Sequence, residues 1–282
     1  MAELQRCYRH PDRETGVSCS ECGRAICPDC MTFSPVGIRC PDHAGVARGP
    51  AKKVVRNLQR SSAGRQGTVT MTLIVINVGI YFLQLAGGAS INASSGWIYQ
   101  HGALYGPLVA QGDWYRLISA AFLHYGPIHL GMNMLALWWI GRPLEDYLGS
   151  LRYVLLYVVS GLAGSAGALI ANPTAVTVGA SGAIFGILGA AIVLERQGTY
   201  VLGGSALTLL IINIAFTFAV PGISIGGHLG GLAGGALCIL ALSRFGKGSA
   251  AYSRIDAASI VSIAAVGLLS VAVAYWKVKG YA

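Results

Sequence analysis

Long apolar stretches separated by short polar connections dominate the chain from residue 68 onward. A stretch of roughly 20 apolar residues is long enough for a helix that crosses the hydrocarbon core of a bilayer. Several stretches are rich in Gly and Ala, which allow helices to pack closely in lipid. The pattern predicts an all-α polytopic membrane protein with seven spans, at about 68–87, 127–147, 151–170, 179–196, 203–219, 226–243 and 257–276.

Composition agrees with a membrane protein. The 282 residues are 54% hydrophobic and only 11% charged, and the mean hydropathy is +0.59. That balance is too apolar for an ordinary soluble protein. The N-terminal residues are polar and cysteine-rich, so we expect no cleavable signal peptide. We divide the chain into a Cys- and His-rich unit (1–43), a linker (44–67), a core of six spans (68–243) and a C-terminal part with the seventh span (244–282).

The linker 44–67 is strongly basic. The formal net charge of the chain is +9, and this linker carries six basic residues and no acidic one. A basic segment can bind nucleic acid, but one that directly precedes a span is more typical of a positive-inside signal that also attracts anionic lipid. We therefore expect the lipid bilayer, and no nucleic acid, as a partner. The six are Arg48, Lys52, Lys53, Arg56, Arg60 and Arg65.

The charges of the connections indicate the orientation. With the N-terminus in the cytosol, the even-numbered connections also lie there, and basic residues favour that side. The opposite connections 171–178 and 220–225 carry no charge, although Lys277 and Lys279 follow the last span on that side. We predict a multi-pass protein of the cell membrane with a cytoplasmic N-terminus. The basic residues on the cytosolic side are Arg142, Arg152, Arg196, Arg244, Lys247 and Arg254.

Polar side chains gather at one predicted depth. Spans two, four and six run in the same direction, so residues near their N-terminal ends share one level in the outer half of the membrane. Those residues are His129 and Asn133, Ser181, and His228. Hydrogen-bonding side chains in hydrocarbon are expensive unless they serve one another or water. We therefore interpret the four residues as one site.

These residue types fit a serine hydrolase. A Ser hydroxyl becomes a nucleophile when a neighbouring base removes its proton, and neutral His228 is a suitable base for Ser181. His129 and Asn133 are four residues apart, so they share a helix face and can stabilise an oxyanion together with the backbone N–H of Ser181. No acidic residue is predicted at this depth, so we expect a Ser-His dyad and no cofactor for catalysis.

Close approach of two helices is a condition of this dyad. Small residues at the right spacing permit it. Gly231 and Gly235 share a face with His228, and span four has a glycine face of its own, Gly182, Gly186 and Gly189.

Each residue also has a simpler interpretation. A lone Ser in a Gly-rich membrane helix more often helps packing, and a buried His such as His228 can bond a backbone carbonyl. Asn133 can form a bond between helices, and His124 can stabilise the loop in which it lies. The combination of residue types, order and depth favours hydrolysis over these alternatives.

The chain resembles the rhomboid family of intramembrane serine proteases. The resemblance implies a rhomboid-like bundle with the six-plus-one helix arrangement, Ser181 as nucleophile, His228 as general base, and an oxyanion hole lined by His129 and Asn133. It also implies that the outer connection 88–126 is half-submerged in the membrane. The matching motifs are Tyr115-Arg116 leading to His124, His129-x-x-x-Asn133, Gly141-Arg142-x-x-Glu145, Gly179-Ala180-Ser181-Gly182 and His228-x-x-Gly231-x-x-x-Gly235.

The same resemblance implies single-span membrane proteins as substrates, and the span at 203–219 with the loop 220–226 as the gate for them. Arg116 and Glu145 would be structural. Phe185 stands where the family often has a Tyr that stacks on the histidine, and Tyr115 stands where a Trp is usual. The alternatives are a catalytically silent rhomboid-like protein that binds membrane clients and, with less support, a transporter, since no internal repeat is evident.

The N-terminal unit contains four chelating pairs with two-residue spacing. Such spacing lets both side chains of a pair reach one tetrahedral Zn²⁺. Eight ligands imply two structural zinc ions, in a cross-brace or with sequential pairing; disulfides are disfavoured in the reducing cytosol. In the cross-brace one ion takes Cys7, His10, Cys27 and Cys30, and the other takes Cys19, Cys22, Cys40 and His43.

The spacing of these pairs resembles a B-box-type zinc finger. The resemblance implies a role in binding a partner, here an unknown cytosolic protein. The remaining cysteine, Cys238, lies within a predicted span and is expected to be a small core residue.

Overall fold

The computed structural model describes residues 5–34, 37–43, 67–88, 90–91, 95–243, 250–251 and 257–281. The chain divides into two units, Met1–Gly64 and Arg65–Ala282. Each is described by itself. The predicted basic linker lies outside the described residues except for Gly67, and so do Arg244, Lys247 and Arg254.

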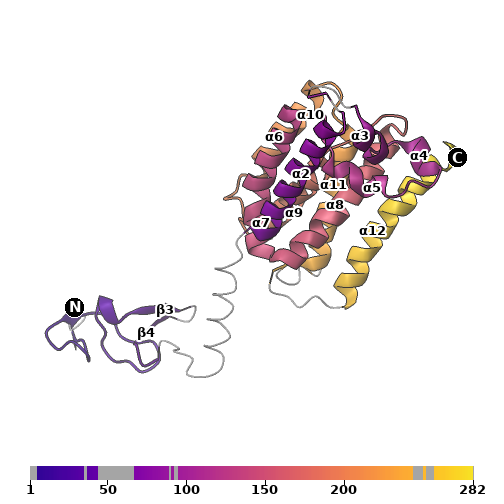
Figure 1. Cartoon of the computed structure of the whole chain (residues 1–282). Helices are drawn as coiled ribbons and strands as arrows, with labels where there is room; N and C mark the ends of the chain where they lie inside the picture. The colour runs from indigo at the N-terminus through magenta and orange to yellow at the C-terminus, as the bar shows by residue number, and fades with distance from the viewer. Residues whose placement is uncertain are drawn as a thin grey trace. The chain divides into compact units, whose positions relative to one another are not determined.

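The small unit has little regular structure. Strand β1 (Gln5–Arg6) pairs antiparallel with β2 (Glu14–Thr15), and β3 (Thr32–Ser34) pairs with β4 (Gly37–Arg39); a 3-10 turn, η1 (Pro28–Cys30), precedes β3 (Figure 1). Its core consists of five cysteines and one large aliphatic side chain, Ile26. Such a small core rarely holds a domain together without disulfides or a metal.

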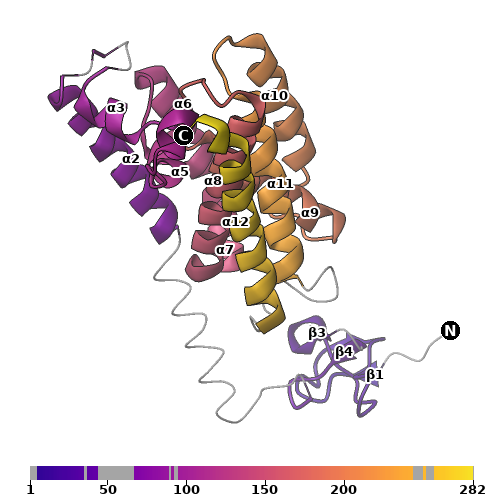
Figure 2. The same ribbon diagram turned by 90° about the vertical axis from the view of Figure 1, so that its right-hand side faces the viewer.

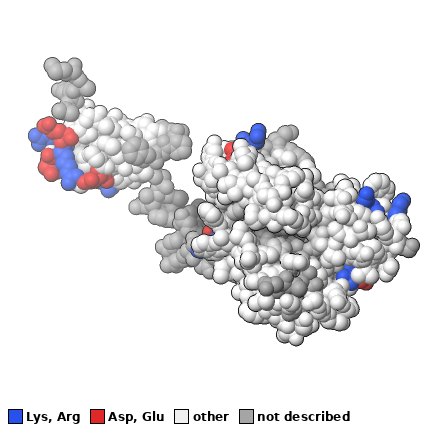
Figure 3. Space-filling view, turned by 90° about the horizontal axis from the view of Figure 1, so that it is seen from above, with Lys and Arg blue, Asp and Glu red and all other residues white. Residues whose placement is uncertain are grey.

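The larger unit is a bundle of helices, which confirms the predicted all-α fold (Figure 1). Side chains of large hydrophobic residues remain exposed on most of its helices, as lipid-facing residues do. Figure 3 shows a mostly uncharged surface on this unit, with a few charged groups near its edges. Its elements are α2 (Thr68–Ala86), α3 (Trp97–Gly102), α4 (Gly106–Ala110), α5 (Arg116–Ser119), η2 (Ala120–Phe122), α6 (Pro127–Ala136), a π-helical turn η3 (Leu137–Gly141), α7 (Arg142–Leu148), α8 (Ser150–Ala171), α9 (Ser181–Arg196), α10 (Ala206–Ala219), α11 (Ile225–Leu242), α12 (Ala257–Val278) and η4 (Lys279–Tyr281).

The helices differ in length more than the hydrophobic pattern suggested. Among the described residues, four are long and apolar enough to cross a membrane: α2, α8, α11 and α12 with η4. The expected second span is divided into α6, η3 and α7, and α9 and α10 have only 16 and 14 residues. The expected spans at 179–196 and 203–219 exceed α9 and α10 only by the small residues at 179–180 and 203–205.

Helix α11 packs against both α8 and α9 through glycine. A Cβ at Gly231 would collide with the carbonyl oxygen of Gly182, and a Cβ at Gly235 would collide with that of Gly186. The expected glycine faces of spans four and six are therefore confirmed. On the other side of α11, Gly167 of α8 touches its first turns, a contact that the spacing did not reveal. Helix α12 lies along α8 and α11 (Figure 2).

The connection before α6 is folded around a buried arginine. Arg116 is 3% exposed, and its guanidinium donates to the carbonyl oxygens of Gln100 and Ala103 and to the carboxylate of Asp113. These bonds join α3 to α5, and a bridge between Leu104 and Thr177 attaches the connection to the segment that leads into α9. Arg116 is thus structural here, as expected.

Glu145 is the second structural residue that the sequence indicated. Its buried carboxylate accepts hydrogen bonds from the backbone N–H groups of Val69 and Thr70 and from the hydroxyls of Thr70 and Ser150. The first N–H groups of a helix have no partner within it, and the helix dipole favours a negative charge there. Glu145 therefore caps the N-terminus of α2 from α7.

Candidate functional site

A cavity of about 780 Å³ opens among the ends of α6, α9, α10 and α11. Ser181, His228, His129 and Asn133 all line it, although they come from three helices that are far apart in sequence. The four predicted site residues are thus brought to one place. Most other lining side chains are apolar, including Met132, Ile184 and Phe216 and residues of the connections around them.

Ser181 is the first residue of α9. Its backbone N–H is therefore among the helix-terminal groups without an intrahelical partner, at the positive end of the helix dipole. Gly179, two residues earlier, has a φ of 123°, and a Cβ there would come within 2.7 Å of the His129 ring. Position 179 therefore requires glycine for two reasons: its backbone has a positive φ, and the imidazole of His129 leaves no room for a Cβ.

The tautomer of His129 follows from its neighbour. The backbone N–H of Tyr125 donates to Nδ1 of His129 at 3.3 Å. Neutral imidazole carries only one proton, so Nε2 holds it and is a donor. The Cβ built on Gly179 lies 2.8 Å from this Nε2, so the donor faces the turn before Ser181. The side-chain amide of Asn133 donates one N–H to the carbonyl oxygen of His129 at 3.0 Å. Its second N–H remains available to a group in the cavity.

His228 is held on two sides. Phe185 of α9 stacks on its ring with centroids 4.0 Å apart and 16° between the planes. The hydroxyl of Thr217, on α10, lies 2.8 Å from Nδ1 of His228. Within the described part of the chain, no hydrogen bond joins His228 to Ser181, and Nε2 of His228 is the ring nitrogen left for that contact.

Two features of this region were not anticipated. Thr217 was missed as a partner of His228; a hydroxyl near the C-terminal end of an apolar helix was the available signal. His124 stabilises its loop through its backbone, whose N–H and C=O both pair with the side chain of Gln84. Its buried ring nitrogens have no hydrogen-bond partner among the described residues, so the expected side-chain bond is not formed.

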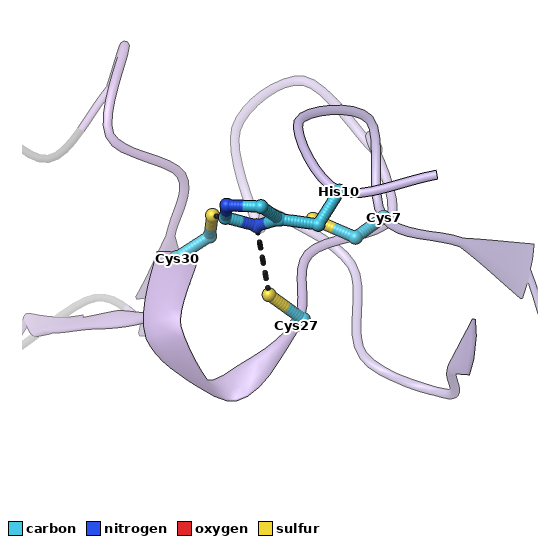
Figure 4. A group of neighbouring side chains, drawn as sticks. All are labelled: Cys7, His10, Cys27 and Cys30. Atoms are coloured by element: carbon cyan, nitrogen blue, oxygen red, sulfur yellow. Dashed lines mark hydrogen bonds between the residues drawn. The ribbon is translucent and has the colours of Figure 1, made fainter. Parts of the chain in front are cut away.

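The small unit contains two Cys and His clusters that could hold metal ions. Each cluster offers four ligand atoms, all within 4.8 Å of one another. The grouping is that of a cross-brace and not of sequential pairs. One cluster is Cys7, His10, Cys27 and Cys30 (Figure 4), and the other is Cys19, Cys22, Cys40 and His43.

The distances within the clusters suit a tetrahedral ion. Zinc bonds of about 2.0–2.3 Å place neighbouring ligand atoms of a tetrahedron about 3.5–3.8 Å apart. Nδ1 of His10 lies 3.3 and 3.4 Å from the sulfurs of Cys27 and Cys30, and the sulfurs of Cys22 and Cys40 are 3.9 Å apart. The donor set therefore fits Zn²⁺ in geometry as well as in chemistry.

The thiol of Cys7 is also electrostatically suited to a metal. Burial raises its pKa, but hydrogen bonds from backbone N–H groups of Cys27, Arg9 and His10 outweigh that effect and lower the pKa to about 6. The thiolate is the form that binds metal, so a lowered pKa of Cys7 favours its role as a ligand.

A cavity with a few polar side chains, enclosed by long apolar helices, indicates a multi-pass membrane protein with a site inside its bundle. Comparison with known proteins gives the particular family. The family model described as the Rhomboid domain matches residues 111–245, which include Ser181, His228, His129 and Asn133. The chain belongs to the rhomboid family.

The curated relatives include proteins named as rhomboid proteases. Rhomboid protease GluP of Bacillus subtilis (strain 168) is 37% identical over 206 residues, which cover 72% of this chain and 40% of GluP. YdcA of the same bacterium is 37% identical over 134 residues, 46% of this chain and 67% of YdcA. RHOMBOID-like protein 5 of Arabidopsis thaliana is 40% identical over 141 residues, 48% of this chain and 46% of that protein. The chain thus spans less than half the length of GluP and of the Arabidopsis protein.

Proposed function

We propose that the protein is an intramembrane serine endopeptidase that cleaves transmembrane segments of membrane proteins through a Ser181–His228 dyad. The observation that carries the proposal is the cavity that Ser181 at a helix N-terminus, the stacked His228, and the donors His129 and Asn133 all line. The relatives named as proteases support the same activity.

The chemistry follows from the donors and acceptors of the cavity. The hydroxyl oxygen of Ser181 attacks the carbonyl carbon of the scissile peptide while its proton passes to Nε2 of His228. The oxyanion that forms accepts hydrogen bonds from Nε2–H of His129, from the amide of Asn133 and from the backbone N–H of Ser181. His228 then gives the proton to the leaving amine. In the second half of the reaction, water attacks the acyl-enzyme, His228 takes a proton from the water, and this proton returns to the oxygen of Ser181 as the ester bond breaks.

Helix lengths support a site below the membrane surface. At about 1.5 Å per residue, α9 rises about 22 Å from Ser181 to Arg196, whereas the hydrocarbon core is about 30 Å thick. With Arg196 at the cytosolic boundary, Ser181 would lie several ångströms inside the outer one. Substrate segments with Gly or Pro near that level are favoured, because their carbonyls are more easily freed from helical hydrogen bonds.

The orientation and substrates are part of the proposal. A cytoplasmic N-terminus places Arg142, Arg152 and Arg196 on the cytosolic side and the cavity on the outer side. Single-span membrane proteins would reach the cavity past α10, which has few buried residues and one face on the cavity.

A serine-reactive fluorophosphonate tests the activity. Full-length protein in bilayers should be labelled, and Ser181→Ala and His228→Ala should abolish labelling. Matched controls are Ser270→Ala, on α12 away from the cavity, and His101→Ala, on the connection before α6; both should be labelled normally. Labelling that persists in the Ser181 and His228 variants would exclude the dyad.

A catalytically silent rhomboid-like protein is the second candidate. The observation in its favour is that Ser181 and His228 form no hydrogen bond in the described structure. A protein of this kind would bind a membrane client in the cavity without cleaving it. Absence of labelling in correctly folded wild-type protein would favour this function.

For the small unit, we propose two structural zinc ions, bound in the cross-brace, and a role in binding a cytosolic protein. The ligand distances and the small core support the metal. The catalytic reaction needs no cofactor in this scheme, because proton transfer and charge stabilisation use only side chains and backbone of the helical unit.

A further inference from the structure

Thr217 is a buried hydroxyl with two partners. It is 5% exposed, and its Oγ1 lies 2.7 Å from the carbonyl oxygen of Asn213 and 2.8 Å from Nδ1 of His228. A hydroxyl has one proton to donate and two lone pairs. The carbonyl oxygen of Asn213 can only accept, so the proton of Thr217 is used there. Towards His228, the Thr217 oxygen is consequently the acceptor.

This arrangement fixes the tautomer of His228. An acceptor at 2.8 Å from Nδ1 requires that Nδ1 carry the imidazole proton, which leaves the lone pair on Nε2. Only that tautomer can take the proton of Ser181. The cavity therefore holds two histidines of opposite tautomer: His129 is a donor at Nε2, because Tyr125 donates to its Nδ1, and His228 is an acceptor at Nε2.

Thr217 is also distinctive within α10. Only Ala206 and Thr217 are buried on this helix, and they lie near its two ends. The end at Ala206 is attached through its backbone N–H to Glu195, while the other end reaches His228 through Thr217. Large apolar side chains such as Ile211 and Phe218 point away from the protein. A buried hydroxyl on a mostly apolar helix is expensive unless its hydrogen bonds have a use.

We propose that Thr217 is the positioning residue that sets the tautomer and ring orientation of His228 for general-base catalysis. It takes the place that an acidic residue holds in a triad, while Phe185 fixes the plane of the ring. The inference rests on the proposed function. In the reaction, the proton of Ser181 moves to Nε2, the bond from Nδ1–H to Thr217 persists through the imidazolium state, and the Nε2 proton then goes to the leaving amine. Thr217 neither gains nor loses a proton.

Kinetics of fluorophosphonate labelling with full-length protein in bilayers provide the first test. Thr217→Val keeps the shape and removes the acceptor, so the maximal labelling rate should fall at least about 10-fold, as expected for loss of one buried hydrogen bond. The probe concentration at half-maximal rate should stay unchanged. Thr217→Ser should restore the rate, and Thr208→Val, an exposed position on the same helix, should behave as wild type. An unchanged rate in Thr217→Val would overturn the proposal.

The second test does not depend on activity. In protein labelled with ¹⁵N at the histidine rings, the signals lost in His228→Ala identify this residue. We expect the Nδ1–H tautomer for neutral His228 in the wild type and a shift towards Nε2–H in Thr217→Val. An Nε2–H tautomer in the wild type would refute the positioning role. Should the wild type show Nδ1–H but no labelling by the probe, the proposed function fails while the role of Thr217 in holding the ring stands.

Discussion

Phe185 and His228 lie face to face, with ring centroids 4.0 Å apart and planes inclined by 16°. The two residues come from α9 and α11, which also supply the proposed nucleophile and base. Stacking therefore holds the imidazole in a plane that is set by the helix carrying Ser181. Aromatic pairs of this kind contribute about 0.5–1.5 kcal/mol beyond their burial.

Replacing Phe185 tests whether the stack orients the base. Phe185→Leu keeps an apolar side chain but removes the flat ring, so His228 gains rotational freedom. We expect the maximal labelling rate with a fluorophosphonate to fall about 10-fold and the protein to lose about 1 kcal/mol of stability, because Phe185 is buried. Phe218→Leu, at an exposed position of α10, is the matched control. Equal rates for the two variants would show that stacking has no part in orienting His228.

The glycine contacts between α9 and α11 make a prediction about stability. In Gly231→Ala the new methyl group meets the carbonyl oxygen of Gly182, so the helices must separate. We expect a loss of about 2 kcal/mol, typical of overpacking, and a lower unfolding temperature in detergent. Gly79→Ala, where nothing lies within 4 Å of the added Cβ, should leave that temperature unchanged. A wild-type unfolding temperature for Gly231→Ala would contradict the packing described above.

Metal analysis tests the two clusters. Purified protein should contain two zinc ions per chain. Cys27→Ser should release zinc and unfold the small unit, because metal binding and folding are coupled in such domains. Fluorophosphonate labelling should remain nearly intact, since the cavity is built from the helical unit alone. Cys238→Ser, which changes a cysteine outside both clusters, should keep the full metal content. A zinc content that is the same in both variants would rule out the proposed ligand set.

The cap of α2 is expected to contribute to stability through Glu145. The backbone N–H of Val69 donates to Oε1 of Glu145 and that of Thr70 donates to Oε2. In Glu145→Gln one of these two oxygens becomes an NH₂ group, so one of the two N–H groups loses its acceptor. Leaving buried donors without a partner costs about 2 kcal/mol. Hydrogen exchange in the first turn of α2 should accelerate, and unfolding should occur at a lower temperature. Thr72→Val, which alters an exposed hydroxyl near the start of the same helix, is the control. If hydrogen exchange in Glu145→Gln were as slow as in this control, Glu145 would not act as a cap.

The proposed orientation can be measured with a membrane-impermeant thiol reagent on intact cells. Thr174→Cys, in the uncharged connection before α9, should react, and Tyr200→Cys, in the connection after α9, should not. Both positions are exposed in the structure, so accessibility within the protein is matched. If only Tyr200→Cys reacted, the proposed orientation would be wrong and the opposite one would hold.

The sequence by itself determined the class of fold. In lipid a backbone must satisfy its hydrogen bonds internally, so a long apolar stretch has little choice but to form a helix. That is why α2, α8, α11 and α12 were predictable within a few residues. The paired spacing of Cys and His was equally informative, because the reach of two side chains to one ion depends on local geometry alone. Counting spans also predicted that Ser181 and His228 share one depth, and the two residues do line one cavity.

Only the tertiary structure decided how these parts meet. The contact of Thr217 with His228, the pairing of Gln84 with the backbone of His124, and the fit of Gly167 against α11 depend on the rotation and tilt of whole helices. A hydrophobic pattern states which residues can face lipid, but several rotations of a mostly apolar helix satisfy it about equally well. Hydrogen bonds and backbone contacts between distant segments select one of them, and these are formed only when the helices have packed.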